Sequence, residues 1–109
     1  SLVSSYEKRS VSSLVEKSPL YLSLLAADDK MDLGLEVYNN KAQCGVCHTL
    51  QTAGSASNIG PDLDLLKPQI SQIIVAVTNG IGVMQAWEGI LTEEEIEAVA
   101  YYVFNSTNK

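Results

Sequence analysis

The chain has 109 residues, 46% of them hydrophobic and 18% charged, which fits one globular domain and not a disordered or fibrous chain. Its 13 acidic residues outnumber the 7 Lys and Arg residues and give a formal net charge of −6 at pH 7. Nucleic acids and anionic membranes carry the same sign of charge, so this balance excludes them as expected partners and favours a partner with a positive docking face. No apolar run approaches the roughly 20 residues that span a bilayer.

The first 27 residues form a Ser-rich segment, which we expect to be an N-terminal extension or arm (residues 1–27), with Pro19 breaking or beginning any helix in it. Residues 28–109 are expected to form the domain proper. Its first predicted helix spans about residues 29–43, and the acidic residues at its start suit the positive end of the helix dipole. Apolar residues and a small glycine then share one helical face: Met31, Gly34, Leu35 and Tyr38.

This helix runs into the only two cysteines and the only histidine of the chain, in the order Cys44-Gly45-Val46-Cys47-His48. The spacing is typical of covalent haem attachment. Each thiol adds across a haem vinyl group, and the residue after the second cysteine projects its imidazole over the iron. Histidine ligates iron well through a neutral ring nitrogen, provided that an acceptor holds the other nitrogen.

Three other interpretations of the cysteine pair stay open. A thioredoxin-like redox couple would need a βαβ context, which the pattern does not indicate. A structural zinc site would need four ligands, and two cysteines with one histidine fall short. A disulfide across two residues would constrain very little of the chain. Haem attachment is therefore the favoured interpretation.

Residues 49–67 are predicted to form a loop, because glycines, a proline and small polar residues dominate them. Pro68 suits the first turn of a second helix that ends near Asn79-Gly80. The apolar face of this helix is marked by Ile70, Ile73, Ile74 and Val77. A second predicted loop, Ile81 to Leu91, contains Met84 and Trp87.

The last helix begins with a capping-box pattern, Thr92 and Glu95, and continues with an apolar face. Glu88 and the run Glu93-Glu94-Glu95 are expected to be solvated, the alternative being an acidic rim that faces a partner. No strand is indicated anywhere. The fold class is therefore all-α, and its long loops are unusual unless they are functional or line a cofactor.

Taken together, these residues resemble the class I c-type cytochromes, small electron carriers whose iron is held by a histidine and a methionine. The resemblance covers about residues 29–104. It rests on the order and spacing of four motifs: Cys44 to His48, then Asn58-Ile59-Gly60-Pro61-Asp62-Leu63, then Asn79-Gly80-Ile81-Gly82-Val83-Met84, then the last helix with Val99, Ala100, Tyr101, Tyr102 and Val103.

The resemblance implies the class I cytochrome c fold, with three main helices and long loops around one covalently bound haem c (iron) per chain. It implies that His48 and Met84 are the axial iron ligands and that the Pro61 carbonyl accepts the ring N–H of His48. The further haem-binding residues would be Cys44, Cys47, Pro61 and Leu63. The family also crosses its first and last helices where a glycine meets an aromatic residue, an arrangement matched by Gly34, Tyr38, Val99 and Tyr102.

Met84 has a second interpretation, because methionine is commonly a flexible core filler, as Met31 is expected to be. Its place in a Gly-rich loop between two helices favours a ligand, and a thioether ligand raises the reduction potential of haem iron. Gln85 follows it, where the family often has proline. This departure would loosen the loop or change the hydrogen bonding near the Met84 sulfur.

The expected function is that of a soluble electron carrier, not an enzyme, taking single electrons from a periplasmic dehydrogenase to an oxidase or another cytochrome. Residues 59–68 and 79–84 look like those of small cytochromes that accept electrons from sulfite dehydrogenases. A periplasmic location is expected because haem attachment takes place outside the bacterial cytoplasm. The alternative is a haem-binding sensor or a catalytic haem subunit with a labile distal ligand. A third hypothesis is a subunit or domain of a larger enzyme, with residues 1–27 as the contact and the same electron-carrying chemistry.

Overall fold

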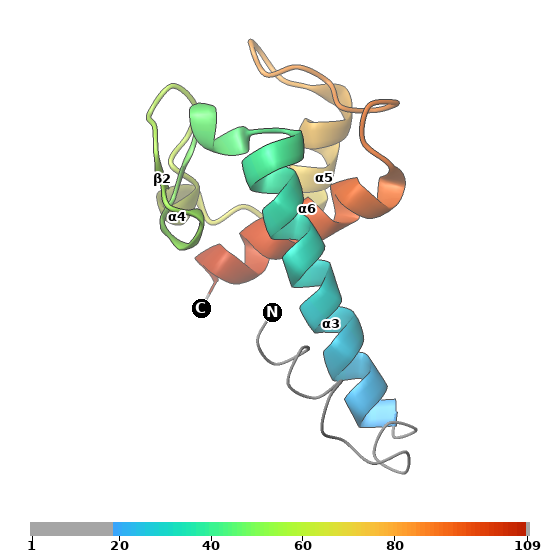
Figure 1. Ribbon diagram of the computed structural model, residues 1–109. Coiled ribbons are helices and arrows are strands. Elements are labelled where there is room, and N and C mark those ends of the chain that lie inside the picture. Colours follow the sequence, from blue (N-terminus) through green and yellow to red (C-terminus); the bar gives the residue numbers. More distant parts are fainter. Residues whose placement is uncertain (1–18, 109) are drawn as a thin grey trace.

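The computed structural model describes residues 19–108, with side chains described from residue 26 onward. Its two longest helices, α3 (Pro19–Glu36) and α6 (Glu93–Thr107), cross each other (Figure 1). At the crossing, a Cβ on Gly34 would overlap the carbonyl oxygen of Ala98 and the Cβ of Tyr102. Only glycine allows this approach, so the predicted crossing of the first and last helices is confirmed.

The first helix differs from its prediction at the N-terminal end. It begins at Pro19 and not near residue 29, because the fixed φ of proline suits the first turn of a helix. α3 therefore runs without a break across the expected boundary between residues 27 and 28. Residues 1–18, most of the expected arm, lie outside the described residues, so the arm stays a prediction.

The C-terminal part of the same helix changes type, which was not predicted. α3 ends at Glu36 and passes into one π-helical turn, Val37–Lys41, in which the Ala42 N–H donates to the Val37 carbonyl at 2.8 Å. Gln43 then adopts a left-handed conformation, with φ 51° and ψ 47°, and ends the helical path before the cysteines. A π-turn shifts the helical register by one residue, and here both Val37 and Tyr38 are fully buried.

The predicted loop over residues 49–67 contains regular structure. Two short strands, β1 (Thr49–Leu50) and β2 (Ser55–Ala56), pair antiparallel, so the expectation of no strand was wrong. A one-turn helix, α4 (Leu63–Leu66), follows Asp62, whose carboxylate caps it by accepting the Asp64 N–H at 3.0 Å. Elements of two to four residues are too short to produce a periodic pattern.

The remaining helix, α5 (Ile70–Asn79), begins two residues after Pro68 and is capped by a reciprocal pair of hydrogen bonds between Gln69 and Gln72. α6 starts at the predicted capping box, in which the Glu95 N–H donates to Thr92 Oγ1 at 3.1 Å. With α3, α5 and α6 as the main helices, the predicted all-α class with three main helices is confirmed.

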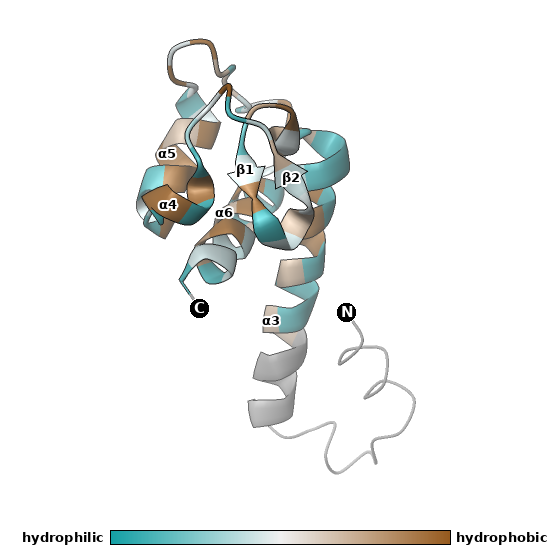
Figure 2. Ribbon diagram, turned by 90° about the vertical axis from the view of Figure 1, so that its left-hand side faces the viewer, coloured by the Kyte–Doolittle hydropathy of each residue, from teal (hydrophilic) through white to brown (hydrophobic). Residues whose placement is uncertain are grey.

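The core lies around α6, against which the end of α3, the π-turn that follows it and α5 all pack (Figure 2). Its buried residues are Val37, Tyr38, Leu50, Ile73, Val77, Leu91, Ile96, Val99, Ala100, Tyr102 and Val103. The core residues come from every predicted helix and also from β1 and the loop before α6. The core therefore holds the connecting loops as well as the helices. Among residues 19–108, no helix combines the length and the apolar character that crossing a bilayer requires.

Candidate haem site

The two cysteines lie on one tight turn. Cys44–Val46 form a single 3₁₀ turn, and the N–H groups of Cys47 and His48 both donate to the Cys44 carbonyl, at 3.2 and 3.0 Å. Both thiols are free and partly buried. The turn therefore presents two thiols and the following imidazole from one compact segment, as attachment to one haem requires.

The structure also bears on the other interpretations of the cysteine pair. Burial raises the pKa of Cys44 to about 11, whereas a redox-active Cys-x-x-Cys pair needs a lowered thiol pKa. In the described part of the chain, no three His, Cys, Asp or Glu side chains gather as a metal site would require, so the zinc interpretation lacks its ligands. Covalent haem attachment remains the chemistry that these residues fit.

His48 is held from two sides by the segment that follows β2. Its Nδ1–H donates to the Pro61 carbonyl at 2.8 Å, the hydrogen bond that the resemblance implies. Gly60 lies against the ring, since a Cβ there would come 2.6 Å from His48 Cε1 and 2.9 Å from Nδ1. With Nδ1 engaged, Nε2 is the nitrogen that can take iron. Sequence reasoning missed this role of Gly60, because a loop glycine carries no signal of what packs against it.

The segment carrying Gly60 and Pro61 is itself tied to the attachment turn. The Gly60 N–H donates to the Cys47 carbonyl at 2.6 Å, and the Gln51 N–H donates to Asp64 Oδ2 at 2.9 Å. Leu63, the remaining haem-binding residue implied by the resemblance, is partly buried and packs against the core at the start of α4. These bonds join residues 47–51 to residues 60–64 and so fix the orientation of the imidazole.

Two tyrosines fasten the β1–β2 hairpin beside the attachment turn. Tyr38 OH lies 2.9 Å from Ser55 Oγ, and Tyr102 OH lies 2.9 Å from Thr52 Oγ1. Burial raises the pKa of Tyr38 to about 12, so its hydroxyl keeps its proton for this bond. The sequence predicted these tyrosines only as part of the helix crossing, since their partners lie in what was expected to be an unstructured loop.

Met84 ends a tight turn between α5 and α6. Ile81 and Met84 exchange two backbone hydrogen bonds, of 3.0 and 2.9 Å, and the Trp87 N–H then donates to the Val77 carbonyl at 2.8 Å. Within this turn Val83 is 97% exposed, whereas Met84 is partly buried and packs against the core. The turn thus directs the Met84 side chain toward the core and leaves the Val83 side chain in solvent.

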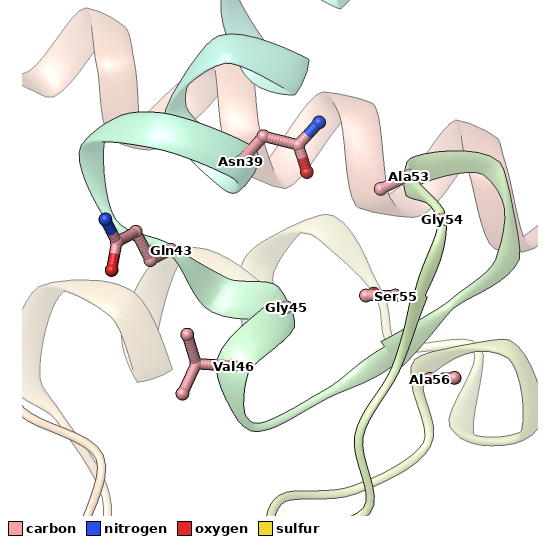
Figure 3. Close-up of a pocket in the computed structure, with 8 residues that line it drawn as sticks. All are labelled: Asn39, Gln43, Gly45, Val46, Ala53, Gly54, Ser55 and Ala56. Carbon is pink, nitrogen blue, oxygen red and sulfur yellow. The ribbon is translucent and has the colours of Figure 1, made fainter.

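A recess of about 410 Å³ opens on the surface beside the attachment turn (Figure 3). Asn39 and Gln43 line it on one side, Gly45 and Val46 at the turn, and residues 53–56 on the other. None of the predicted haem-binding residues lines it, although Gly45 and Val46 belong to the attachment turn.

The sequence is similar to a known protein family and to individual cytochromes. Residues 29–103 match the family described as cytochrome c oxidase, cbb3-type, subunit III. Cytochrome c6 of Chlorolobion braunii is 37% identical over 83 residues, which cover 67% of this chain and 86% of that protein. Cytochrome c6 of Tetradesmus obliquus is 36% identical over 87 residues, covering 71% of this chain and 93% of the relative.

A solved structure is also similar. The c-type cytochrome SorU from Sinorhizobium meliloti superposes with a TM-score of 0.70 at 48% sequence identity. The match covers 75% of this chain and 95% of that one.

Proposed function

Because the chain belongs to the class I c-type cytochromes and is an electron carrier with one covalently bound haem c, we propose that His48 and Met84 ligate its iron. Haem iron held in this way changes its charge by one electron at a time and leaves no position open to a substrate. The observation that carries the proposal is the placement of His48, with Nδ1 bonded to Pro61 and Nε2 left for iron.

The attachment turn would provide the covalent bonds to the haem. Cys44 and Cys47 would each form one thioether, and Leu63 would pack nearby. The Pro61 carbonyl holds His48 in one tautomer and orientation and makes its imidazole a stronger donor.

Met84 would supply the distal ligand from the turn that begins at Ile81. Its thioether favours the reduced state of the iron and so raises the reduction potential. The two hydrogen bonds between Ile81 and Met84 support this role, because they hold the turn although Gln85 replaces the usual proline.

The donor that we propose is a periplasmic dehydrogenase, with a sulfite dehydrogenase as the specific candidate, and the acceptor is an oxidase or another cytochrome. The motifs over residues 59–68 and 79–84 support this donor. The location would be the periplasm, where haem is attached, and the protein would be soluble there.

The partner would dock with a positive face. Exposed carboxylates gather at the start of α6 and in the loop before it, on Glu88, Glu93 and Glu94. Residues 42–61, by contrast, contain no Asp, Glu, Lys or Arg. Electrostatic steering would therefore come from the α6 end of the site and not from the attachment turn.

The test is the absorption spectrum of the haem-loaded protein, oxidised and reduced, with and without carbon monoxide. We expect carbon monoxide to leave the reduced spectrum of the wild type unchanged and to bind readily to Met84→Ala. Met31→Leu, which alters the other methionine, should behave like the wild type. Ready binding of carbon monoxide to the wild type would contradict the proposal and favour a sensor or a catalytic haem subunit.

A further inference from the structure

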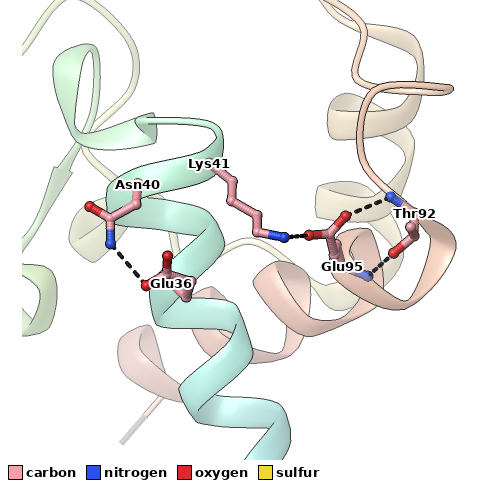
Figure 4. A network of polar contacts seen from close by, with 5 residues as sticks. All are labelled: Glu36, Asn40, Lys41, Thr92 and Glu95. Carbon is pink, nitrogen blue, oxygen red and sulfur yellow. Dashed lines mark hydrogen bonds and ion pairs between the residues drawn. The ribbon is translucent and has the colours of Figure 1, made fainter.

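One buried carboxylate joins the two segments that carry the proposed iron ligands (Figure 4). The Glu95 side chain is only 11% exposed, and both of its oxygens have partners. Oε1 accepts the Thr92 N–H at 2.9 Å, and Oε2 accepts a charged hydrogen bond from Lys41 Nζ. A charged group with this degree of burial is stable only because it is fully bonded.

The partners of Glu95 come from opposite sides of the site. Lys41 is the last residue of the π-turn and lies three positions before Cys44, on the segment that carries the attachment turn. Thr92 caps α6 and ends the loop that begins after α5 and contains Met84. The carboxylate therefore links the segment of His48 to the segment of Met84 across 54 residues of sequence.

Elsewhere the loop of Met84 is held mainly from the side of α5. The Trp87 N–H donates to the Val77 carbonyl, and the Leu91 side chain packs into the core. These contacts fix the loop to α5 and to the hydrophobic core. Glu93, Glu94 and Glu97 lie on the same helix as Glu95, yet they are exposed.

We propose that Glu95, through Lys41, is a positioning residue that keeps the loop of Met84 closed and so holds the Met84 sulfur on the iron. The inference rests on the proposed function, since it takes Met84 to be the distal ligand. It goes beyond that function by naming the contact that keeps Met84 in place although Gln85, and not proline, follows it. A loop that opens more often exposes the iron for a larger fraction of the time, and binding of an external ligand rises in proportion to that fraction.

The test is the rate at which carbon monoxide binds to reduced, haem-loaded variants. Glu95→Gln keeps an oxygen for the Thr92 N–H but removes the charge that holds Lys41. We expect the rate to rise about tenfold, as expected for loss of one charge-assisted hydrogen bond. Glu97→Gln makes the same charge change on the exposed side of α6 and should bind like the wild type.

Two variants of the partner residue keep the test informative if Glu95→Gln folds poorly. Lys41→Met should raise the carbon monoxide rate as Glu95→Gln does, and Lys41→Arg should restore the wild-type rate. The absorption band of the methionine–iron bond in the oxidised protein should weaken in Lys41→Met and persist in Lys41→Arg. A purely structural role would lower the melting temperature of Lys41→Met without changing this band or the rate, and that result would overturn the inference.

The failure of this inference and the failure of the proposed function give different results. If Met84→Ala binds carbon monoxide while Glu95→Gln and Lys41→Met resist it like the wild type, Glu95 does not position Met84 and the proposed function stands. If the wild type binds carbon monoxide as fast as Met84→Ala, Met84 is not a firm ligand, and both proposals fall.

Discussion

Gly60→Ala should displace the imidazole that the attachment turn presents. A Cβ at this position would lie 2.6 Å from Cε1 and 2.9 Å from Nδ1 of His48, whereas carbon atoms normally approach to about 3.5–4.0 Å. The ring must therefore move, and its 2.8 Å hydrogen bond to Pro61 breaks. Overpacking costs about 1–3 kcal/mol and the lost hydrogen bond about 1 kcal/mol, so the free energy of unfolding should fall by about 2–4 kcal/mol.

The assay is chemical unfolding of the haem-loaded protein, followed by circular dichroism and by the haem absorption band, with the reduction potential measured alongside. The potential should rise, because the imidazole donates less strongly without its bond to Pro61. Gly54→Ala is the matched control: no atom lies within 4 Å of its Cβ, and its φ of 73° predicts a cost of about 1 kcal/mol. The reasoning would be refuted if Gly60→Ala cost no more than this control and left the potential unchanged.

Four further predictions concern other parts of the structure. Lys67 ends α4 with a φ of 48°, so Lys67→Gly should raise the free energy of unfolding by about 1 kcal/mol in urea titrations. Tyr38→Phe removes the bond to Ser55 Oγ and should lower that free energy by about 1 kcal/mol, with the helix content measured by circular dichroism unchanged. The hydrogen bond from Lys41 lowers the pKa of Glu95 from about 4.5, so the stability that this carboxylate adds is present above that pH and is lost as the pH falls through the lowered value. Glu95→Gln should therefore remove part of the loss of stability in acid, and an unchanged acid profile would contradict this assignment. Reversal of the charges on Glu88, Glu93 and Glu94 to Lys should slow electron transfer with a positively charged partner and weaken its dependence on salt, as stopped-flow rates at two ionic strengths would show.

The features that could be predicted from the sequence are those formed by residues close together in the chain. The attachment motif is a run of five residues, and the chemistry of two thiols and an imidazole follows from their order. The capping box of Thr92 and Glu95 is a pattern of similar length, and the structure contains it. The crossing of α3 and α6 was also predicted, but through the family resemblance, since Gly34 alone shows only that one face of a helix is bare.

Other features could not be predicted from local patterns. Apolar spacing cannot distinguish a π-turn from a continuing α-helix, so the register change at Val37–Lys41 was missed. The run Glu93-Glu94-Glu95 was expected to be solvated as a whole, whereas Glu95 is buried. The residue that makes this burial possible is Lys41, and no pattern within α6 points to it.

The two sides of the candidate site therefore differ in how they are encoded. His48 is oriented by Gly60 and Pro61, which follow it closely: the Pro61 carbonyl accepts from the imidazole, and the Gly60 N–H donates to the carbonyl of the neighbouring Cys47. The covalent side is therefore specified largely within residues 43–64. Met84 lies on a short turn whose own hydrogen bonds fix its shape but not its distance from the attachment segment. That distance depends on the contacts of α6 with α3, with α5 and with the π-turn, among them the bond between Lys41 and Glu95. In our proposal, the hold on Met84 therefore depends in part on a pair of residues that neither ligand motif contains, and the motifs alone cannot separate a tightly closed electron carrier from a haem protein with a labile ligand.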